Sequence, residues 1–202
     1  MAGRRELILD SALGIAGEQG LHRMTHRAVD AAAGLPLGST SNYFRTREDL
    51  LTAVIERFAQ LERGDWDDIA AVSHPVSAAE LSGVMAEWVR GAVGAHRSVT
   101  VARYGFLVQA ALDPSWQRLL APGADRVNTW ATNWFRTVGS AAPERDAQMI
   151  MAMVDGMVLH QLSHPDPAFD PYVRLRTLID TLIPPVTTGE RDGRERDLVG
   201  DR

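Results

Sequence analysis

Small polar side chains gather on one short segment, where their types suit contact with the edges of nucleic-acid bases. Asn42 can form paired hydrogen bonds with adenine or bond a phosphate, and Ser39 and Ser41 can serve either purpose. Leu37 offers an apolar contact to a thymine methyl group, and Gly38 permits close approach. The segment therefore predicts contact with double-stranded DNA.

Two short helices are needed to hold these residues. Thr25 is a suitable N-cap for a helix that runs through Ala33 and stops at Gly34, and a shorter helix follows from about Leu37 to Phe44. Two short helices joined by a turn that contains glycine predict a helix-turn-helix, whose second helix reads the bases.

Longer helices are expected on both sides of this motif. The first runs from about Arg4 to Gln19 and ends at Gly20. Thr46 caps the helix that follows the motif, and Asp49 completes a capping box. That helix has an apolar face with spacings of three and four, which predicts burial. The face consists of Leu50, Leu51, Val54, Ile55, Phe58 and Leu61.

The segment from Thr25 to Leu51 resembles the N-terminal signature of the tetracycline-repressor (TetR) family. A leading Thr, Ala-Gly before the turn, a Gly-Ser pair, Tyr-Phe, and a basic residue followed by an acid and Leu occur in order. The segment departs from the family pattern at Asp30, where Ala is usual, and at Ser41, where an aromatic residue is common. The resemblance implies DNA contacts by Thr25, His26, Arg27, Leu37, Gly38, Ser39, Ser41, Asn42, Tyr43 and Arg47.

Composition and charge are compatible with this interpretation. The chain has 202 residues, a net charge of -5 and no cysteine, which excludes disulfides, thiol catalysis and Cys-based zinc sites. Residues 1–47 carry six Arg against four acidic residues, so any phosphate-facing surface belongs at the N-terminus. No basic-then-apolar leader and no run of about 18 apolar residues occurs, so we expect a soluble, cytoplasmic protein without a membrane partner.

Helical periodicity interrupted by Pro and Gly predicts an all-α fold. We expect a three-helix DNA-binding domain, a connecting helix, a larger helical domain and a disordered polar tail. The corresponding ranges are 1–47, 48–64, 65–185 and 186–202. Helices of the larger domain are expected at about 77–96, 98–112, 115–139, 144–164 and 171–183, the third being open to a break at Pro122-Gly123.

The resemblance implies that the larger domain binds a ligand among its middle helices. Aromatic and Met side chains line adaptable apolar cavities, but at helical spacing they also form ordinary cores. The candidate pocket residues are Trp88, Tyr104, Phe106, Trp116, Trp130, Trp134, Met153 and Asp155.

The expected helix at 144–164 is apolar around most of its circumference, which indicates partners on two sides. With the last helix it suits the four-helix dimer interface of TetR proteins, and two-fold symmetry would place two recognition helices on a near-palindromic operator. The candidate interface residues are Ile150, Val154, Met157, Val158, Leu175, Leu178, Ile179 and Leu182.

Asp155 and two histidines leave other chemistry open. A buried Asp155 needs a partner, which is either a polar group of a ligand or a neighbouring helix. His160 and His164 have a spacing that can bind a metal on one helix face, but no third ligand is nearby in the sequence. A helical enzyme that uses Asp155 with one of these histidines is an alternative, yet nothing supplies a nucleophile, a phosphate loop or a full metal set. We therefore predict no catalytic residue, metal or cofactor.

The leading hypothesis is a homodimeric repressor that a small, mainly apolar molecule releases from its operator. The alternatives are a regulator controlled by a protein partner and a transcriptional activator. An open cavity lined by Trp and Met would favour the small molecule, whereas a filled, dry interior would favour the protein partner.

Overall fold

Helices are the regular secondary structure of the computed structural model, which describes residues 3–184. Within this range the side chains of residues 63, 65–68 and 70 are not described, and the predicted tail, 186–202, lies outside it. The predicted all-α fold is confirmed. In chain order the elements are α1 (Arg4–Gln19), the 3-10 turn η1 (Leu21–Arg23), α2 (His26–Ala32), α3 (Ser39–Tyr43), α4 (Arg47–Val72), α5 (Ala78–Val93), α6 (Arg97–Leu112), α7 (Pro114–Thr137), α8 (Pro143–Ser163) and α9 (Pro171–Leu182).

The N-terminal helices begin where the sequence supplies a capping side chain. The Thr25 hydroxyl accepts a hydrogen bond from the backbone N–H of Ala28 at 3.2 Å and so starts α2. At the start of α4, the Thr46 hydroxyl accepts from the Asp49 N–H, and the Asp49 carboxylate accepts from the Thr46 N–H, both at 3.0 Å. This capping box matches the one predicted, because each partner satisfies a helix-end donor of the other.

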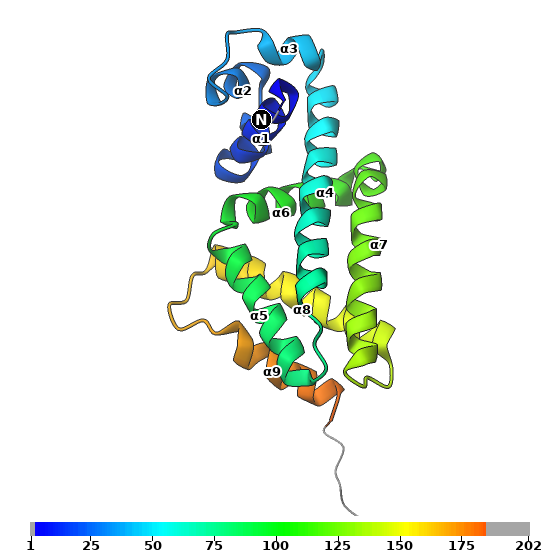
Figure 1. Cartoon of the computed structure of the whole chain (residues 1–202). Helices are drawn as coiled ribbons and strands as arrows, with labels where there is room; N and C mark the ends of the chain where they lie inside the picture. The colour runs from blue at the N-terminus through cyan, green and yellow to red at the C-terminus, as the bar shows by residue number, and fades with distance from the viewer. Residues whose placement is uncertain (1–2, 185–202) are drawn as a thin grey trace, which may run out of the picture.

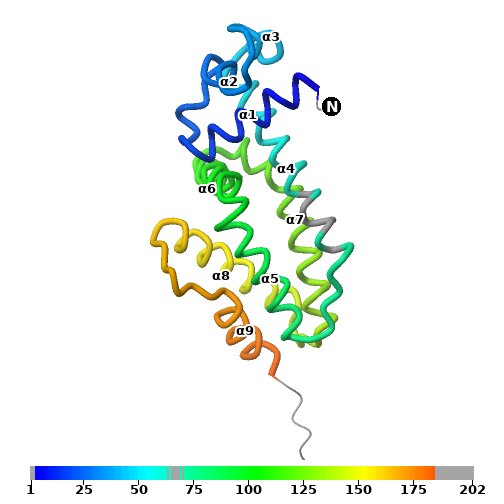
Figure 2. The backbone as a smooth tube through the Cα atoms, turned by 60° about the vertical axis from the view of Figure 1, so that its left-hand side comes forward, coloured from blue at the N-terminus to red at the C-terminus, as the bar shows by residue number. Residues whose placement is uncertain are grey.

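Two helices extend further than the sequence signals suggested. The connecting helix, expected to end at residue 64, continues as α4 to Val72. Similarly, α7 passes through Pro122 without ending. Proline removes only one backbone donor from the helix, and α7 is held in place by packing against α4, α6 and α8. As a result α4 and α7 lie side by side along much of the molecule (Figures 1 and 2).

The first apolar core joins the helices of the predicted DNA-binding domain to α6. Residues of α1, α2 and α4 pack around one cluster, and Ala102 and Phe106 of α6 complete it. The ring centroids of Phe106 and Phe58 are 5.3 Å apart, and those of Phe106 and Trp116 are 6.3 Å apart. The N-terminal part therefore does not have a core of its own. Its buried members include Ile8, Leu9, Leu13, Ile15, Met24, Val29, Leu50, Val54, Ile55 and Phe58.

The second core is formed by the C-terminal helices α5, α7, α8 and α9. In Figure 1, α5, α8 and α9 lie below α6, and α7 runs down beside α4. No helix in the described part of the chain is long and apolar enough to cross a membrane. The buried members of this core include Leu81, Met85, Val89, Phe135, Ile150, Val154, Val158, Leu175 and Ile179.

The first turn of α6 meets α1 at a close backbone contact. A Cβ atom added to Gly17 of α1 would overlap the backbone carbonyl of Ser98, so only glycine fits there. Figure 1 shows α6 crossing directly beneath α1. The two halves of the molecule thus meet at this point through the backbones of Gly17 and Ser98, with the Ser98 hydroxyl beside them.

Candidate DNA interface and ligand pocket

A buried carboxylate holds the start of α3. Asp30 on α2 is 1% exposed. One of its oxygens accepts hydrogen bonds from the Thr40 N–H at 2.7 Å and the Thr40 hydroxyl at 2.6 Å, and the other accepts from the Gly38 N–H at 2.7 Å. Burial raises the pKa of Asp30, but these hydrogen bonds outweigh it and leave the pKa below its ordinary value. Asp30 therefore supplies the capping group that Gly38, the N-cap residue of α3, lacks.

The recognition helix is shorter than predicted, because Leu37 and Gly38 precede it. Gly38 is the N-cap residue and has φ +89°, a left-handed conformation that favours glycine. Leu37 lies in the turn with 74% of its surface exposed. The expected placement of both residues on the helix was wrong, although both remain beside it.

Several predicted contact residues are open to an approaching partner. Ser41, Asn42 and Tyr43 are exposed on α3, and Arg27 is exposed on α2. Both helices lie at the end of the molecule opposite α9 (Figure 1). Hydroxyl, amide and guanidinium groups on one end of the molecule suit contact with base edges and phosphates.

Four other predicted contact residues also bond within the chain. Thr25 caps α2. His26, Ser39 and Arg47 each donate a hydrogen bond to a backbone carbonyl, at 2.7, 2.7 and 3.0 Å. These bonds fix the turns around the motif, so a structural role accompanies any contact that these side chains make with DNA.

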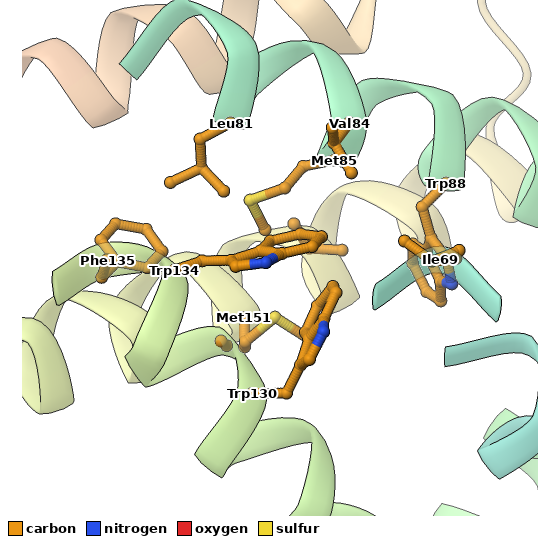
Figure 3. Close-up of a pocket in the computed structure, with 11 residues that line it drawn as sticks. Ile69, Leu81, Val84, Met85, Trp88, Trp130, Trp134, Phe135 and Met151 are labelled. Carbon is orange, nitrogen blue, oxygen red and sulfur yellow. The ribbon is translucent and has the colours of Figure 1, made fainter. Parts of the chain in front are cut away.

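An apolar pocket lies in the second core (Figure 3). The ring of Trp134 crosses its middle, with Met85 on one side and Trp130 and Met151 on the other. The Trp130 and Trp134 ring centroids are 3.5 Å apart with the planes tilted by 49°. The cavity has a volume of about 20 Å³, close to what one water molecule needs. The lining residues are Ile69 of α4, Leu81, Val84, Met85 and Trp88 of α5, Trp130, Ala131, Trp134 and Phe135 of α7, and Met151 and Val154 of α8.

Three of the eight predicted pocket residues line this pocket, namely Trp88, Trp130 and Trp134. Phe106 and Trp116 instead belong to the first core. Both aromatic rings are on helices near the domain junction, and the sequence does not show whether a given face of such a helix packs into the first or the second core. The remaining lining residues from α5 were missed, although their apolar spacing of three and four was visible in the sequence.

Met153, Tyr104 and Asp155 also lie outside the pocket lining. Met153 is 49% exposed on the opposite face of α8. The Tyr104 hydroxyl donates to the backbone carbonyl of Asp155 at 3.0 Å, and Nη1 of Arg103 donates to the Asp155 carboxylate at 2.7 Å. Of the two roles considered for Asp155, the structure shows the bond to a neighbouring helix.

Arg103 has a second carboxylate partner. Its Nε donates to Glu62 of α4 at 3.1 Å. Burial lowers the pKa of Arg103, but the charges of Asp155 and Glu62 outweigh it and raise the pKa above the ordinary value. Burial, assisted by the charge of Asp155, raises the pKa of Tyr104 to about 12. At neutral pH the guanidinium is therefore charged and the phenol keeps its proton as a donor.

Most of the predicted dimer-interface residues are core residues of a single chain. Six of the eight predicted residues are at most 6% exposed, so a second chain cannot reach them, whereas Leu178 and Leu182 are partly buried. The exposed large apolar residues of the same two helices are Met149, Met153 and Leu159 of α8 and Val173 of α9. The six buried residues are Ile150, Val154, Met157, Val158, Leu175 and Ile179.

The two histidines of α8 stack on each other. The ring centroids of His160 and His164 are 5.1 Å apart, and the Ser163 hydroxyl lies 2.9 Å from Nδ1 of His164. Within residues 3–184, no further His, Asp or Glu joins them in a group that could hold a metal ion. Asp155 pairs with Arg103, so the acid-base pair of the enzyme alternative has no geometric support in these contacts.

Two family profiles match this chain over most of its length. The profile described as "Bacterial regulatory proteins, tetR family" matches residues 8–54, and "Tetracyclin repressor-like, C-terminal domain" matches residues 76–185. The chain belongs to the TetR family. It is thus a transcriptional regulator with a helix-turn-helix DNA-binding domain and a C-terminal ligand-binding domain. TetR proteins are regulators rather than enzymes.

Solved structures of TetR-like regulators share the fold over nearly the whole chain. SCO1917 from Streptomyces coelicolor A3 is 26% identical, with a TM-score of 0.69 and coverage of 91% of this chain and 99% of that one. The multidrug binding protein EbrR, solved with imidazole, is 26% identical, with a TM-score of 0.66 and coverage of 93% and 99%. A regulator from Rhodococcus sp. Rha1 is 19% identical with a TM-score of 0.75, covering 89% and 96%, and shows the fold alone. No curated protein matches the chain.

Proposed function

We propose that this TetR regulator is a homodimeric repressor that a small, mainly apolar molecule releases from a near-palindromic operator. One observation carries the proposal: α4 is a single helix that begins four residues after α3 and reaches the pocket wall at Ile69. A change at the pocket therefore has a continuous helical path to the DNA-reading end. A hundredfold weaker operator affinity corresponds to about 2.7 kcal/mol, which a few altered contacts can supply.

The pocket lining indicates an aromatic effector. Three indole rings and two Met side chains offer dispersion and sulfur-aromatic contacts, and indole faces also attract delocalised cations. EbrR has been solved with ethidium, proflavin and malachite green, all aromatic cations, at 25–26% identity to this chain. The present cavity accommodates about one water molecule, so the effector must push the indoles and Met side chains apart.

The small cavity also supports a second candidate function. If the pocket stays closed, the second core is simply a filled interior, and a protein partner rather than a small molecule controls operator binding. The two candidates differ in one measurable property, namely whether an aromatic probe perturbs the pocket tryptophans.

For the dimer, we propose the exposed face of α8 and the adjoining face of α9. Met149, Met153 and Leu159 of α8 and Val173 of α9 are each at least 49% exposed in the single chain. Ala152 and Gly156 are exposed on α8 between them, and small residues permit close helix packing. A two-fold contact here would place the two recognition helices at one end of the dimer.

The operator is tested by selecting bound DNA from a random pool. We expect an enriched near-palindrome, bound with an affinity that falls steeply as salt rises because phosphate contacts release counterions. Asn42→Ala should weaken binding, whereas Asp125→Ala, at an exposed acid of α7, should leave it unchanged. Weak binding without an enriched sequence and without salt dependence would contradict the proposal.

The effector site is tested by titrating malachite green against the intrinsic tryptophan fluorescence. Quenching should saturate, and Trp130→Phe should weaken the dye affinity by about tenfold if one indole contact is lost. Trp116→Phe is the matched control, because Trp116 packs on the first core. Unsaturable quenching, or equal loss in both variants, would favour control by a protein partner. Repression is then tested with a reporter gene behind the selected operator.

The dimer is tested by sedimentation of two charged variants. Met153→Glu should shift the protein to monomers, because a carboxylate would be buried at the two-fold contact. Val108→Glu changes a residue that is 60% exposed on α6 and should leave the dimer intact. If both variants remain dimers, the dimer interface lies elsewhere on the molecule.

A further inference from the structure

The side chain of Arg103 connects three helices that belong to different parts of the molecule. From α6, its guanidinium donates to Glu62 on α4 at 3.1 Å and to Asp155 on α8 at 2.7 Å. The Arg103 and Glu62 side chains are only 20% and 21% exposed. A planar guanidinium holds two carboxylates in fixed directions, so the positions of α4 and α8 depend on each other through this residue.

One end of this connection lies at the pocket wall. Asp155 directly follows Val154 and comes one helical turn after Met151, and both residues line the pocket. Tyr104 binds the Asp155 backbone, which fixes this turn of α8 against α6. A molecule that displaces Met151 or Val154 therefore also displaces the carboxylate that Arg103 holds.

The other end lies at the DNA-binding domain. Arg103 follows Ala102 and precedes Phe106 by three positions, and both of these residues are buried in the first core. Glu62 belongs to α4, whose N-terminus follows the recognition helix. Five residues before Arg103, the Ser98 backbone meets Gly17 of α1. Movement of Arg103 is therefore passed on both through α4 and through α6.

We propose that Arg103 is the positioning residue that couples occupancy of the pocket to the DNA-binding domain. The inference rests on the proposed effector site and adds which residue transmits its state. Displacement of Asp155 changes the direction in which Arg103 holds Glu62, and α4 and the first turn of α6 shift in response. The residue needs no contact with either DNA or effector.

The test is a double-mutant cycle read by hydrogen exchange at the backbone amides of residues 17–21 and 98–101. Met151→Ala removes a side chain from the pocket wall and should change exchange at these amides by about tenfold, within the usual range of coupling between sites. In an Arg103→Met background the same substitution should change it by less than about twofold. Arg103→Lys keeps the charge but not the two-pronged geometry and should restore part of the effect.

Two further variants keep the result interpretable. Arg176→Met removes an arginine from the α9 ion pair with Asp180 and should leave the coupling intact. If Arg103→Met does not fold, the triple variant E62Q/R103M/D155N removes all three charges together and is used in its place. Full transmission from Met151 to residues 17–21 in Arg103→Met, or in the triple variant that replaces it, would overturn the proposal.

Malachite green gives a second measurement on the same variants. Dye binding to the wild type should alter exchange at residues 17–21, and Arg103→Met should abolish this change while the tryptophan quenching stays the same. Absence of quenching in the wild type would reject the proposed effector site, whereas the Met151 cycle would still decide the role of Arg103. If dye binding alters exchange in Arg103→Met as much as in the wild type, and the quenching is normal, the role of Arg103 is rejected while the proposed effector site stands.

Discussion

The two ends of this molecule hold their functional residues in different ways. At the DNA-binding end, α3 is fixed by directional hydrogen bonds from Thr40 and Gly38 to Asp30, which is 1% exposed. At the other end, the pocket is lined by indole, thioether and hydrocarbon side chains. Hydrogen bonds impose one geometry, whereas apolar contacts have no preferred direction and Met side chains repack readily. The recognition helix is therefore held in one geometry, whereas the pocket can change its shape.

The largest expected effect tests whether the two ends have separate cores. Phe106 is on α6, yet it packs beside Phe58 in the first core and is fully buried. Phe106→Ala should lower the free energy of unfolding by about 3–5 kcal/mol, measured by urea titration. Leu107→Ala, at a neighbour that is 37% exposed, should cost less than about 1 kcal/mol. Equal losses would mean that α6 is no part of the N-terminal core.

The next effect concerns the rigidity of the recognition helix. Asp30→Ala leaves the Thr40 and Gly38 donors without their acceptor, and we expect a loss of about 2–3 kcal/mol in the free energy of unfolding. Glu18→Ala, at an exposed acid near the end of α1, is the matched control. Operator affinity should fall for Asp30→Ala only. If stability falls while operator affinity is unchanged, α3 keeps its position without the cap.

The same carboxylate predicts a dependence on pH. The pKa of Asp30 is lowered from 3.8 in the folded protein, so the unfolded chain binds its proton first as the pH falls. Its contribution to stability is therefore complete above pH 3.8 and is lost as the pH drops through the lower, folded value. Urea titrations across this acidic range should show that the free energy of unfolding falls more steeply with decreasing pH for the wild type than for Asp30→Ala. Parallel curves would assign the acid sensitivity to other groups.

A smaller effect tests the backbone contact between the two ends. Gly17→Ala places a methyl group against the Ser98 carbonyl, and we expect a cost of about 1–3 kcal/mol as α1 and α6 separate. Gly14→Ala is the control in the same helix, because nothing lies within 4 Å of its added Cβ. That variant should gain up to about 1 kcal/mol from helix propensity. If Gly17→Ala leaves the free energy of unfolding unchanged, α1 and α6 can move apart at little cost.

The smallest effect concerns two serines of the recognition helix. Ser41 is exposed, whereas the Ser39 hydroxyl donates to the Pro36 carbonyl. Ser41→Ala should change the preferred base at one operator position by about 1 kcal/mol without a change in stability, measured by selection and thermal unfolding. Ser39→Ala should instead lower stability slightly and weaken binding to all sequences. An unchanged selected operator for Ser41→Ala would remove Ser41 from the reading surface.

Local signals explain why the DNA-binding end could be largely predicted from the sequence. Thr25, Thr46 and Asp49 act within three residues of themselves, so their capping roles were visible in the sequence. Asp30 was recognised only as a departure from the family pattern, because its partners are eight and ten residues away. The length of α3 was misjudged for a similar reason: the positive φ of Gly38 comes from the turn that Asp30 fixes.

The C-terminal end was harder to predict because its contacts are far apart in sequence. Phe106 and Trp130 are both aromatic residues in helices, yet one belongs to the first core and the other to the pocket. The apolar character of α8 did not show which of its faces packs within the same chain, and a partner on its exposed face remains a prediction. Met153 and Val154 are adjacent, and the first is 49% exposed while the second is 1% exposed.

Because α4 is uninterrupted, its length determines how far its N-terminus moves when the helix tilts at the pocket. From Ile69 at the pocket to Arg47 beside the recognition helix, a rise of 1.5 Å per residue gives a lever arm of roughly 33 Å. A rotation of about six degrees at the pocket would swing the far end by roughly 3.4 Å, the rise of one base pair. In the proposed dimer, an effector that tilts this helix slightly would thus move each recognition helix out of register with its half-site while every helix stays folded.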